Sequence, residues 1–119
     1  MNQLGPQHAA TVRRLVAAAE KCSVPRPVYE IHGAPCCLIG HAAERVISQL
    51  RGQSLCAADF SPVREILQSD GLDADLCREA QEIFDKTCKT ASQYEFTSRL
   101  TEAITQWATK RCPHYKEVP

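Results

Sequence analysis

Apolar residues recur at every third or fourth position along most of this chain, which is the spacing that gathers them on one face of an α-helix. Five stretches of the sequence show this pattern. Their ends carry residues that begin or end helices, such as a proline at the first helical position or a glycine just after the last turn. We therefore predict five helices, within residues 6–21, 35–50, 61–71, 73–88 and 92–112.

Two of these helices have features that a structure can test. Gly40 lies inside the second predicted helix, where glycine costs about 1 kcal/mol relative to alanine, so we predict that another backbone approaches it closely. Ser92 and Glu95 have the spacing of a capping box at the start of the last helix. In a capping box each side chain accepts a hydrogen bond from the other residue's backbone N–H. Pro113 should end that helix.

The segment 28–37 has a different pattern, because it begins with strand-forming residues in alternation with a polar one. It also contains the dipeptide His32-Gly33, a plausible turn in which Gly33 can take a positive φ. We predict a short β-hairpin here. Two strands alone are marginally stable, so the hairpin should pack on the helices.

The expected fold is mainly α, a compact bundle of about five helices with one short β-hairpin between the first and second helices. A chain of 119 residues has the size of one domain, so we predict a single domain over residues 1–119 with a loose tail at 114–119. Asp70, Asp73 and Asp75 do not match a calcium-binding loop, because its glycine and terminal glutamate positions are not filled. We interpret them as helix caps and turn residues.

Composition narrows the classes of function. Lysine plus arginine equals aspartate plus glutamate, at 14 each, so there is no basic field to bind phosphates and we expect no nucleic-acid partner. No apolar run approaches the roughly 20 residues of a membrane span, and the first residues lack a secretory pattern. We therefore expect a cytoplasmic protein that does not enter membranes.

The chain contains seven cysteines. Because the number is odd and no export signal precedes them, a complete disulfide framework is a poor interpretation. Reduced cysteine behaves as a small, soft hydrophobe and is often buried. We predict that most of these thiols pack in the core.

Cys37 and His41 are the best candidates for catalysis. A helix that begins at Cys36 or Cys37 would place a thiol in its first turn, where the helix dipole lowers the thiol pKa. His41 follows Cys37 by four residues, on the same helical face, and could accept the thiol proton. The alternative is that both cysteines pack where the hairpin meets the helix and that His41 is a surface side chain.

A metal site is a second alternative, with Cys36, Cys37, Cys112 and His114 as its weak candidate ligands and Cys22 as a possible addition. The spacing argues against it, because structural zinc sites usually separate paired ligands by two or more residues. No phosphate-binding loop, nucleophile elbow or zincin motif is present either. We predict neither a metal nor another cofactor.

Aromatic residues suggest where a partner could bind. Tyr94, Phe96 and Trp107 recur at helical spacing, which favours a place in the core over a ligand cleft. Tyr29, His32 and Tyr115 are expected to be partly exposed. Exposed loops often carry recognition, so Tyr29, His32 and Gly33, at the tip of the predicted hairpin, are the candidate contact residues for a partner.

Two stretches of the chain resemble a known family. Residues 33–43, GAPCCLIGHAA, are similar to a signature of glycine, cysteine and then Leu-x-Gly-x-x-x-Ala, and Phe84-Asp85 with residues 90–103 resembles a second signature. The family consists of uncharacterised small helical proteins from actinobacteria and bacteriophages. This chain departs from it in its doubled cysteine, in His41 and in an inserted third helix. The resemblance implies a helical architecture and a phage or mobile-element origin, and it implies no activity.

The sequence therefore favours a non-enzymatic domain that binds a protein, such as an accessory factor of a phage or mobile element that acts on a host protein. Two alternatives stay open: a cysteine-dependent enzyme or redox protein centred on Cys37 and His41, and a small zinc-stabilised domain. A homodimer is also compatible with the pattern, because a helical face left over after packing can pair with its twin.

Overall fold

The computed structural model describes residues 6–26, 28–53 and 60–116. Within these residues the chain forms six α-helices, a turn of 3-10 helix and a two-stranded hairpin, which confirms the mainly α fold and the place of the hairpin. The elements are α1 (Pro6–Lys21), β1 (Glu30–Ile31), β2 (Ala34–Pro35), α2 (Leu38–Ala42), η1 (Glu44–Val46), α3 (Ile47–Leu50), α4 (Ser61–Ser69), α5 (Ala74–Thr90) and α6 (Phe96–Arg111). Cys56 and residues 117–119 lie outside the described residues.

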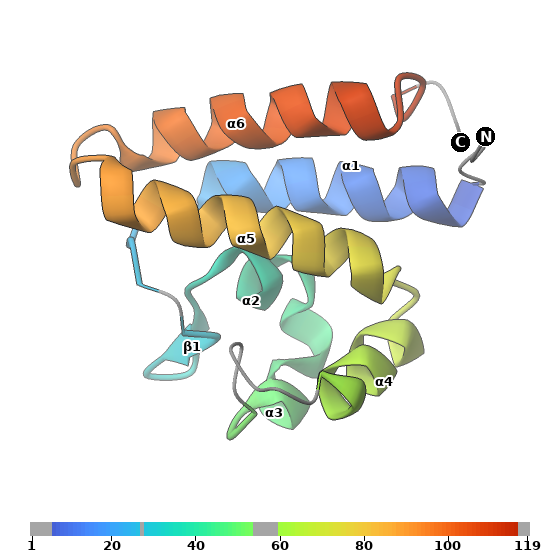
Figure 1. Ribbon diagram of the computed structural model, residues 1–119. Helices are drawn as coiled ribbons and strands as arrows, with labels where there is room; N and C mark the ends of the chain where they lie inside the picture. Colours follow the sequence, from blue (N-terminus) through green and yellow to red (C-terminus); the bar gives the residue numbers. More distant parts are fainter. Residues whose placement is uncertain (1–5, 27, 54–59, 117–119) are drawn as a thin grey trace.

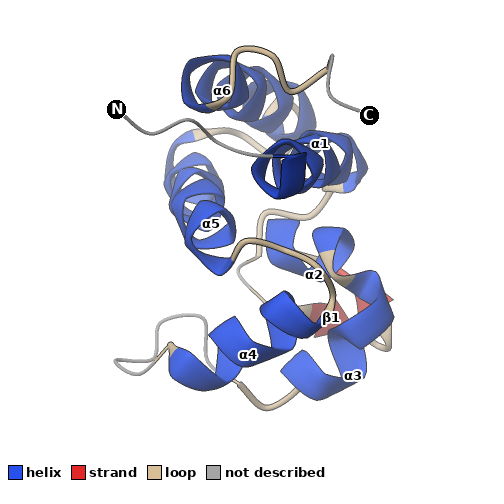
Figure 2. Ribbon diagram, turned by 90° about the vertical axis from the view of Figure 1, so that its right-hand side faces the viewer, coloured by secondary structure: helices blue, strands red, loops and turns tan. Residues whose placement is uncertain are grey.

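The elements form two parts (Figures 1 and 2). The three long helices α1, α5 and α6 lie side by side, and α6 runs in the opposite direction to the other two. The hairpin, α2, η1, α3 and α4 lie beneath them, with α2 packed against α1 and α5. Because α1 and α5 run in the same direction, their C-terminal ends and the start of α6 meet at one end of the molecule, on the side where the hairpin lies.

One hydrophobic core runs through both parts. The three long helices pack their apolar stripes against one another, and α2 and α4 extend the core below α1 and α5. Phe84 of α5 and Phe96 of α6 pack edge to face, with ring centroids 5.5 Å apart. Phe96 is therefore a core residue, as predicted.

The hairpin pairs Glu30 with Pro35 and Ile31 with Ala34. Its two turn residues, His32 and Gly33, have positive φ angles of 52° and 84°, which is the conformation of the two-residue turn that matches the twist of the strands. The sequence signal in His32-Gly33 is confirmed.

The second predicted helix is wrong as a single element, because three short pieces occupy its residues. The backbone leaves helical geometry at Ala43 (φ −114°, ψ 37°) and again at Val46 (φ −114°, ψ 20°). The carbonyl of Ala42 accepts a hydrogen bond from Arg14 Nη2 at 2.6 Å, while the N–H of Val46 turns to the carbonyl of Ala43 at 3.0 Å. A long-range contact thus replaces the helical hydrogen bond of Ala42.

Gly40 lies in α2 directly against Tyr29, the residue before β1. A Cβ atom on Gly40 would stand 2.2 Å from the carbonyl oxygen of Tyr29, a distance that excludes any side chain. This confirms the predicted close approach of another backbone, and it explains how the hairpin packs on α2.

The acidic residues at 70–75 are structural, as predicted. Asp73 caps α5 by accepting a hydrogen bond from the N–H of Leu76 at 2.9 Å. Asp75 pairs with Arg64 at 2.9 Å, and Asp70 ends α4, where its carboxylate pairs with Arg14 at 2.5 Å.

Three helix ends differ from the prediction. The capping box does not form, because Ser92 to Glu95 make a turn in which the N–H of Glu95 bonds the carbonyl of Ser92 at 3.1 Å, and α6 begins at Phe96. Helix α5 continues to Thr90, beyond the predicted end before residue 89. Ser61 is the first residue of α4 instead of its cap.

The predicted loose tail is also corrected at its start. Tyr115 is buried, and its carbonyl accepts a hydrogen bond from Arg13 Nη1 at 2.7 Å. The chain after α6 therefore folds back onto α1 at least as far as Tyr115. The prediction that Tyr115 is partly exposed is wrong.

Candidate functional site

The two adjacent cysteines lie where the hairpin passes into α2. The N–H of Cys36 donates to the carbonyl of Tyr29 at 3.0 Å, and that of Cys37 donates to the carbonyl of Val28 at 2.9 Å. Cys37 is the N-cap of α2, and its sulfur accepts a hydrogen bond from the N–H of Gly40 at 3.3 Å. The hairpin backbone thus fixes both thiols in place.

The environment of Cys37 does not favour a nucleophile. Its side chain is fully buried, and this burial raises the thiol pKa to about 12, although the hydrogen bonds from Gly40 and Ile39 act in the opposite direction. The expected lowering of its pKa by the helix start is therefore wrong, because desolvation of the thiolate outweighs the two donors.

His41 lies on the same short helix and is half-buried. Burial lowers its pKa, and the charge of Lys21 lowers it further. The backbone N–H of His41 donates to the carbonyl of Cys37 at 3.0 Å, but among the described residues no hydrogen bond joins the imidazole to the thiol, which accepts from the N–H of Gly40. The four-residue spacing thus places the two residues on one helix without making them a catalytic pair.

Two further thiols approach Cys36 and Cys37 from other elements. Cys22 follows the end of α1, and Cys88 lies in the last turns of α5. Burial raises the pKa of Cys22 to about 12, and the charges of Cys37, Cys36 and Cys88 would raise it further. We call these four residues the thiol cluster. Cys22, Cys36 and Cys37 are buried and Cys88 is half-buried, which confirms the expected packing role for these residues.

The predicted metal ligands are divided between two ends of the molecule. Thr97, at the start of α6, donates to the carbonyl of Cys22 at 2.7 Å, whereas Cys112 follows the last residue of the same helix. Fifteen residues of helix separate Thr97 from Cys112, about 22 Å, so Cys112 and His114 lie far from the thiol cluster. Within residues 6–26, 28–53 and 60–116, no group of three or more His, Cys, Asp or Glu side chains is placed to hold a metal ion.

The candidate contact residues of the hairpin have different positions. Tyr29 is buried against the core, so the prediction that it lies at the surface is wrong. His32 and Gly33 are exposed at the turn. Val28 is exposed and Tyr29 is buried, so the alternation of side chains along an extended segment could have indicated the position of Tyr29.

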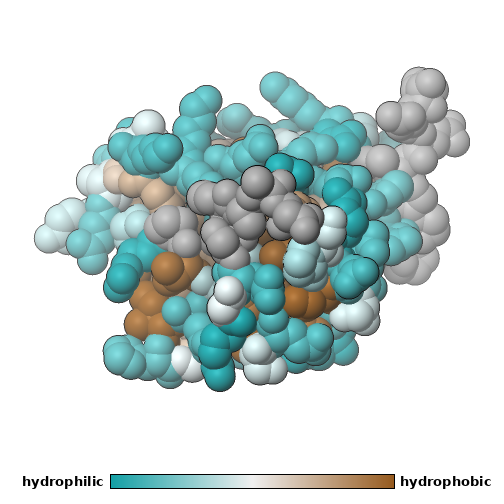
Figure 3. Space-filling model, turned by 60° about the horizontal axis from the view of Figure 1, so that its bottom comes forward, coloured by the Kyte–Doolittle hydropathy of each residue, from teal (hydrophilic) through white to brown (hydrophobic). Residues whose placement is uncertain are grey.

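Three large apolar or aromatic side chains are exposed among the described residues, and all belong to the same end of the molecule. Tyr94 is 100% exposed, Val24 is 38% exposed and Val28 is 36% exposed. Val24 and Val28 follow α1, and Tyr94 lies in the turn before α6, which the hydrogen bond from Thr97 to Cys22 holds beside that loop. On the underside of the molecule, Figure 3 shows hydrophobic surface toward this end and also right of the centre. We call this surface, together with His32 and Gly33, the Tyr94 end.

Sequence analysis missed most of this surface. Tyr94 was expected in the core because it shares a helical spacing with Phe96 and Trp107, and the structure corrects this, since α6 begins only at Phe96 and Tyr94 is exposed. Trp107, which was also expected in the core, is half-buried, and its Nε1 donates a hydrogen bond to Glu79 at 3.1 Å. For Val24 and Val28 the only available signal was their position beside prolines in a loop.

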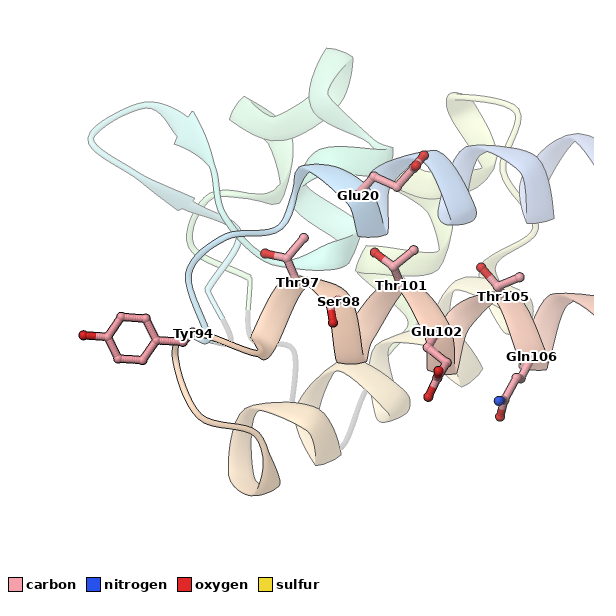
Figure 4. A pocket seen from close by; sticks show the side chains of 8 residues that line it. All are labelled: Glu20, Tyr94, Thr97, Ser98, Thr101, Glu102, Thr105 and Gln106. Carbon is pink, nitrogen blue, oxygen red and sulfur yellow. The ribbon is translucent and has the colours of Figure 1, made fainter.

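A groove of about 670 Å³ extends from Tyr94 along the outer side of α6. Figure 4 shows two rows of side chains on α6, one pointing toward α1 and one away from it, with Tyr94 projecting from the end. The groove is lined by Glu20, Tyr94, Thr97, Ser98, Thr101, Glu102, Thr105 and Gln106.

Comparison of the chain with protein-family models, curated proteins and solved structures gives no match. The resemblance to the actinobacterial and phage family therefore stays a prediction. Among the described residues, no helix combines the length and the apolar composition needed to cross a bilayer.

Proposed function

We propose that this chain is a protein-binding domain without enzymatic activity, and that it contacts its partner through the Tyr94 end. The observation that carries the proposal is the complete exposure of Tyr94 at the same end of the molecule as the exposed Val24 and Val28. Tyrosine is enriched among the residues that dominate binding energy in protein interfaces. Exposed apolar side chains gathered at one place are typical of interaction surfaces.

The backbone around these side chains supports the same function. Thr97 bonds the carbonyl of Cys22, and the turn before α6 is closed by the bond from Glu95 to Ser92. A contact surface on a fixed backbone loses less conformational freedom when it binds. The Tyr94 end is therefore suited to recognition without a large rearrangement.

The cysteine-dependent alternative receives less support. Burial raises the pKa of Cys22, Cys37 and Cys77 to about 12 and that of Cys88 to about 11. At neutral pH such thiols are protonated, and the thiolate is the nucleophile. We therefore assign the thiols to packing.

Two narrower proposals rest on other grounds. The free thiols favour a reducing compartment, so we propose a cytoplasmic location. The resemblance to the family of small helical proteins is the ground for proposing an accessory factor of a phage or mobile element that binds a host protein.

Site-specific cross-linking in the source cells tests the proposal. A photoreactive phenylalanine analogue at position 94 should cross-link one protein in preference to others, because that side chain would lie in the interface. The same analogue at Gln68, an exposed residue of α4, is the matched control and should not cross-link that protein. Equal sets of products at both positions, or none at position 94, would contradict the proposal.

A further inference from the structure

The outer face of α6 is not covered by any described element. The helix packs on α1 and α5, and Ser98, Glu102 and Gln106 are exposed and point away from α1. These three residues repeat at intervals of four. Thr97, Thr101 and Thr105 form a second row with the same interval, nearer to α1 (Figure 4).

Two such rows make the geometry by which helices pack. Residues four apart on a helix form ridges, and the ridge of a second helix fits into the groove between them. The groove here has short threonine and serine side chains along much of its length, so a second helix can approach closely. From Thr97 to Gln106 it is about 14 Å long, which corresponds to between two and three turns of an approaching helix.

The charges along the groove indicate the chemistry of the occupant. Glu20 of α1 and Glu102 of α6 line it, and its eight described lining residues include no lysine, arginine or histidine. Arg99 lies on the same helix but pairs with Glu95 at 3.4 Å and does not line the groove. The groove thus presents two carboxylates and, at one end, the exposed ring of Tyr94.

We propose that this groove docks one α-helix of the partner protein, and that this helix carries lysine or arginine opposite Glu20 and Glu102 and an apolar side chain against Tyr94. The inference rests on the proposed function and adds the shape and charge of the partner. The tyrosine ring offers a large apolar contact area with little loss of side-chain freedom, and the carboxylates favour a basic helix over an acidic one.

A defined peptide provides the test. The probe is a fluorescent, end-capped helical peptide of leucine, alanine and lysine, with lysines four residues apart, titrated by anisotropy at about 0.15 M salt, where exposed charges more than ~8 Å apart are largely screened. We expect saturable binding, a loss of at least tenfold in affinity for Tyr94→Ala and retained affinity for Tyr94→Phe. The same peptide with glutamate in place of lysine should not bind.

Two double variants separate this groove from general charge attraction. Glu20→Gln with Glu102→Gln should weaken binding at least tenfold. Glu44→Gln with Glu65→Gln, which changes the net charge equally at exposed sites outside the groove, should leave it unchanged. Equal losses in both, or no saturable binding of the lysine peptide, would overturn the inference. If the peptide fails while position 94 still cross-links one protein, the proposed function stands and the basic helix is wrong.

Discussion

The thiol cluster and the Tyr94 end occupy the same end of the molecule, and they differ in whether solvent reaches them. Three thiols of the cluster are buried beneath the hairpin, and Cys88 is half-buried. Tyr94 is fully exposed a few residues away from α6 residues that pack in the core. The thiols, which have the more reactive side chains, thus lie inside the protein, and the less reactive Tyr94 lies at its surface.

This difference shows that residue type alone does not locate a functional site. Cysteine beside a helix start and a histidine favours nucleophilic chemistry only when the thiolate is solvated or paired with a positive charge. Here burial raises the pKa of Cys37 instead of lowering it. The exposure of a side chain, which residue type does not predict well, instead identifies Tyr94 as the candidate contact residue.

The largest expected effect is a loss of folding stability at alkaline pH. Its measurement tests the interpretation of the thiols as core residues. Cys22, Cys37 and Cys77 have folded-state pKa values raised from 9.0 to about 12. Their contribution is therefore fully present below pH 9 and is lost as the pH rises from 9 toward 12, because only the unfolded chain releases these protons readily. At pH 10 the loss should be about 1.4 kcal/mol for each thiol, or about 4 kcal/mol for the three.

Urea unfolding at pH 8, 9 and 10 measures this loss. Cys77→Ala should reduce the dependence on pH by about a third, whatever its effect on stability at pH 8. A free energy of unfolding that stays constant from pH 8 to pH 10 would show that these thiols are not buried as described.

The next effect tests the contact between the hairpin and α2. Gly40→Ala would place a methyl group 2.2 Å from the carbonyl oxygen of Tyr29, so we expect a loss of about 3 kcal/mol in denaturant unfolding. Gly33→Ala is the control: nothing lies within 4 Å of its Cβ position, and only the positive φ of 84° opposes alanine, at a cost of about 1–2 kcal/mol. Equal losses in the two variants would contradict the close approach. Because neither Gly40 nor Gly33 lines the groove along α6, the affinity for the peptide should be retained at temperatures where the variants stay folded.

A third comparison concerns two arginines that pair with aspartates. Arg14 bonds the carbonyls of Ala42 and Asp70, and the carboxylate of Asp70, whose side chain is 6% exposed. Arg14→Met should cost about 3 kcal/mol, because it leaves the carbonyls of Ala42 and Asp70 without this donor and leaves the Asp70 carboxylate paired with Arg45 alone. Arg64→Met removes an exposed pair with Asp75 and should reduce stability much less than Arg14→Met does. Thermal unfolding of the two variants measures the difference, and similar midpoints would refute the role assigned to Arg14.

Local patterns in the sequence predicted the long helices, the hairpin and its turn, because apolar periodicity and the His32-Gly33 dipeptide act over a few residues. The close backbone contact of Gly40 was also predictable, since glycine inside a helix needs a reason. The breaks at Ala43 and Val46 were not, because Arg14 is 28 residues away from Ala42 and only the fold brings them together.

The site was less predictable than the fold. Cys36 and Cys37 were candidates from their spacing, but their association with Cys22 and Cys88 depends on how α1 and α5 end beside the hairpin. Tyr94 was expected inside the last helix because Ser92 and Glu95 match a capping box that the chain does not form. A match over four residues of sequence does not show whether those residues form the first turn of the helix or, as here, a separate turn before it.

The most direct test of the account compares Tyr94→Ala with Cys88→Ala, the second of which removes the half-buried thiol of the cluster. The protein that cross-links to position 94 would be titrated against both variants and the unchanged chain. The account predicts at least tenfold weaker binding for Tyr94→Ala, which corresponds to a loss of about 1.4 kcal/mol in binding free energy. For Cys88→Ala it predicts a change in affinity of less than about twofold. Binding that survives the loss of Tyr94 but fails without Cys88 would contradict it and would place the functional site at the thiols.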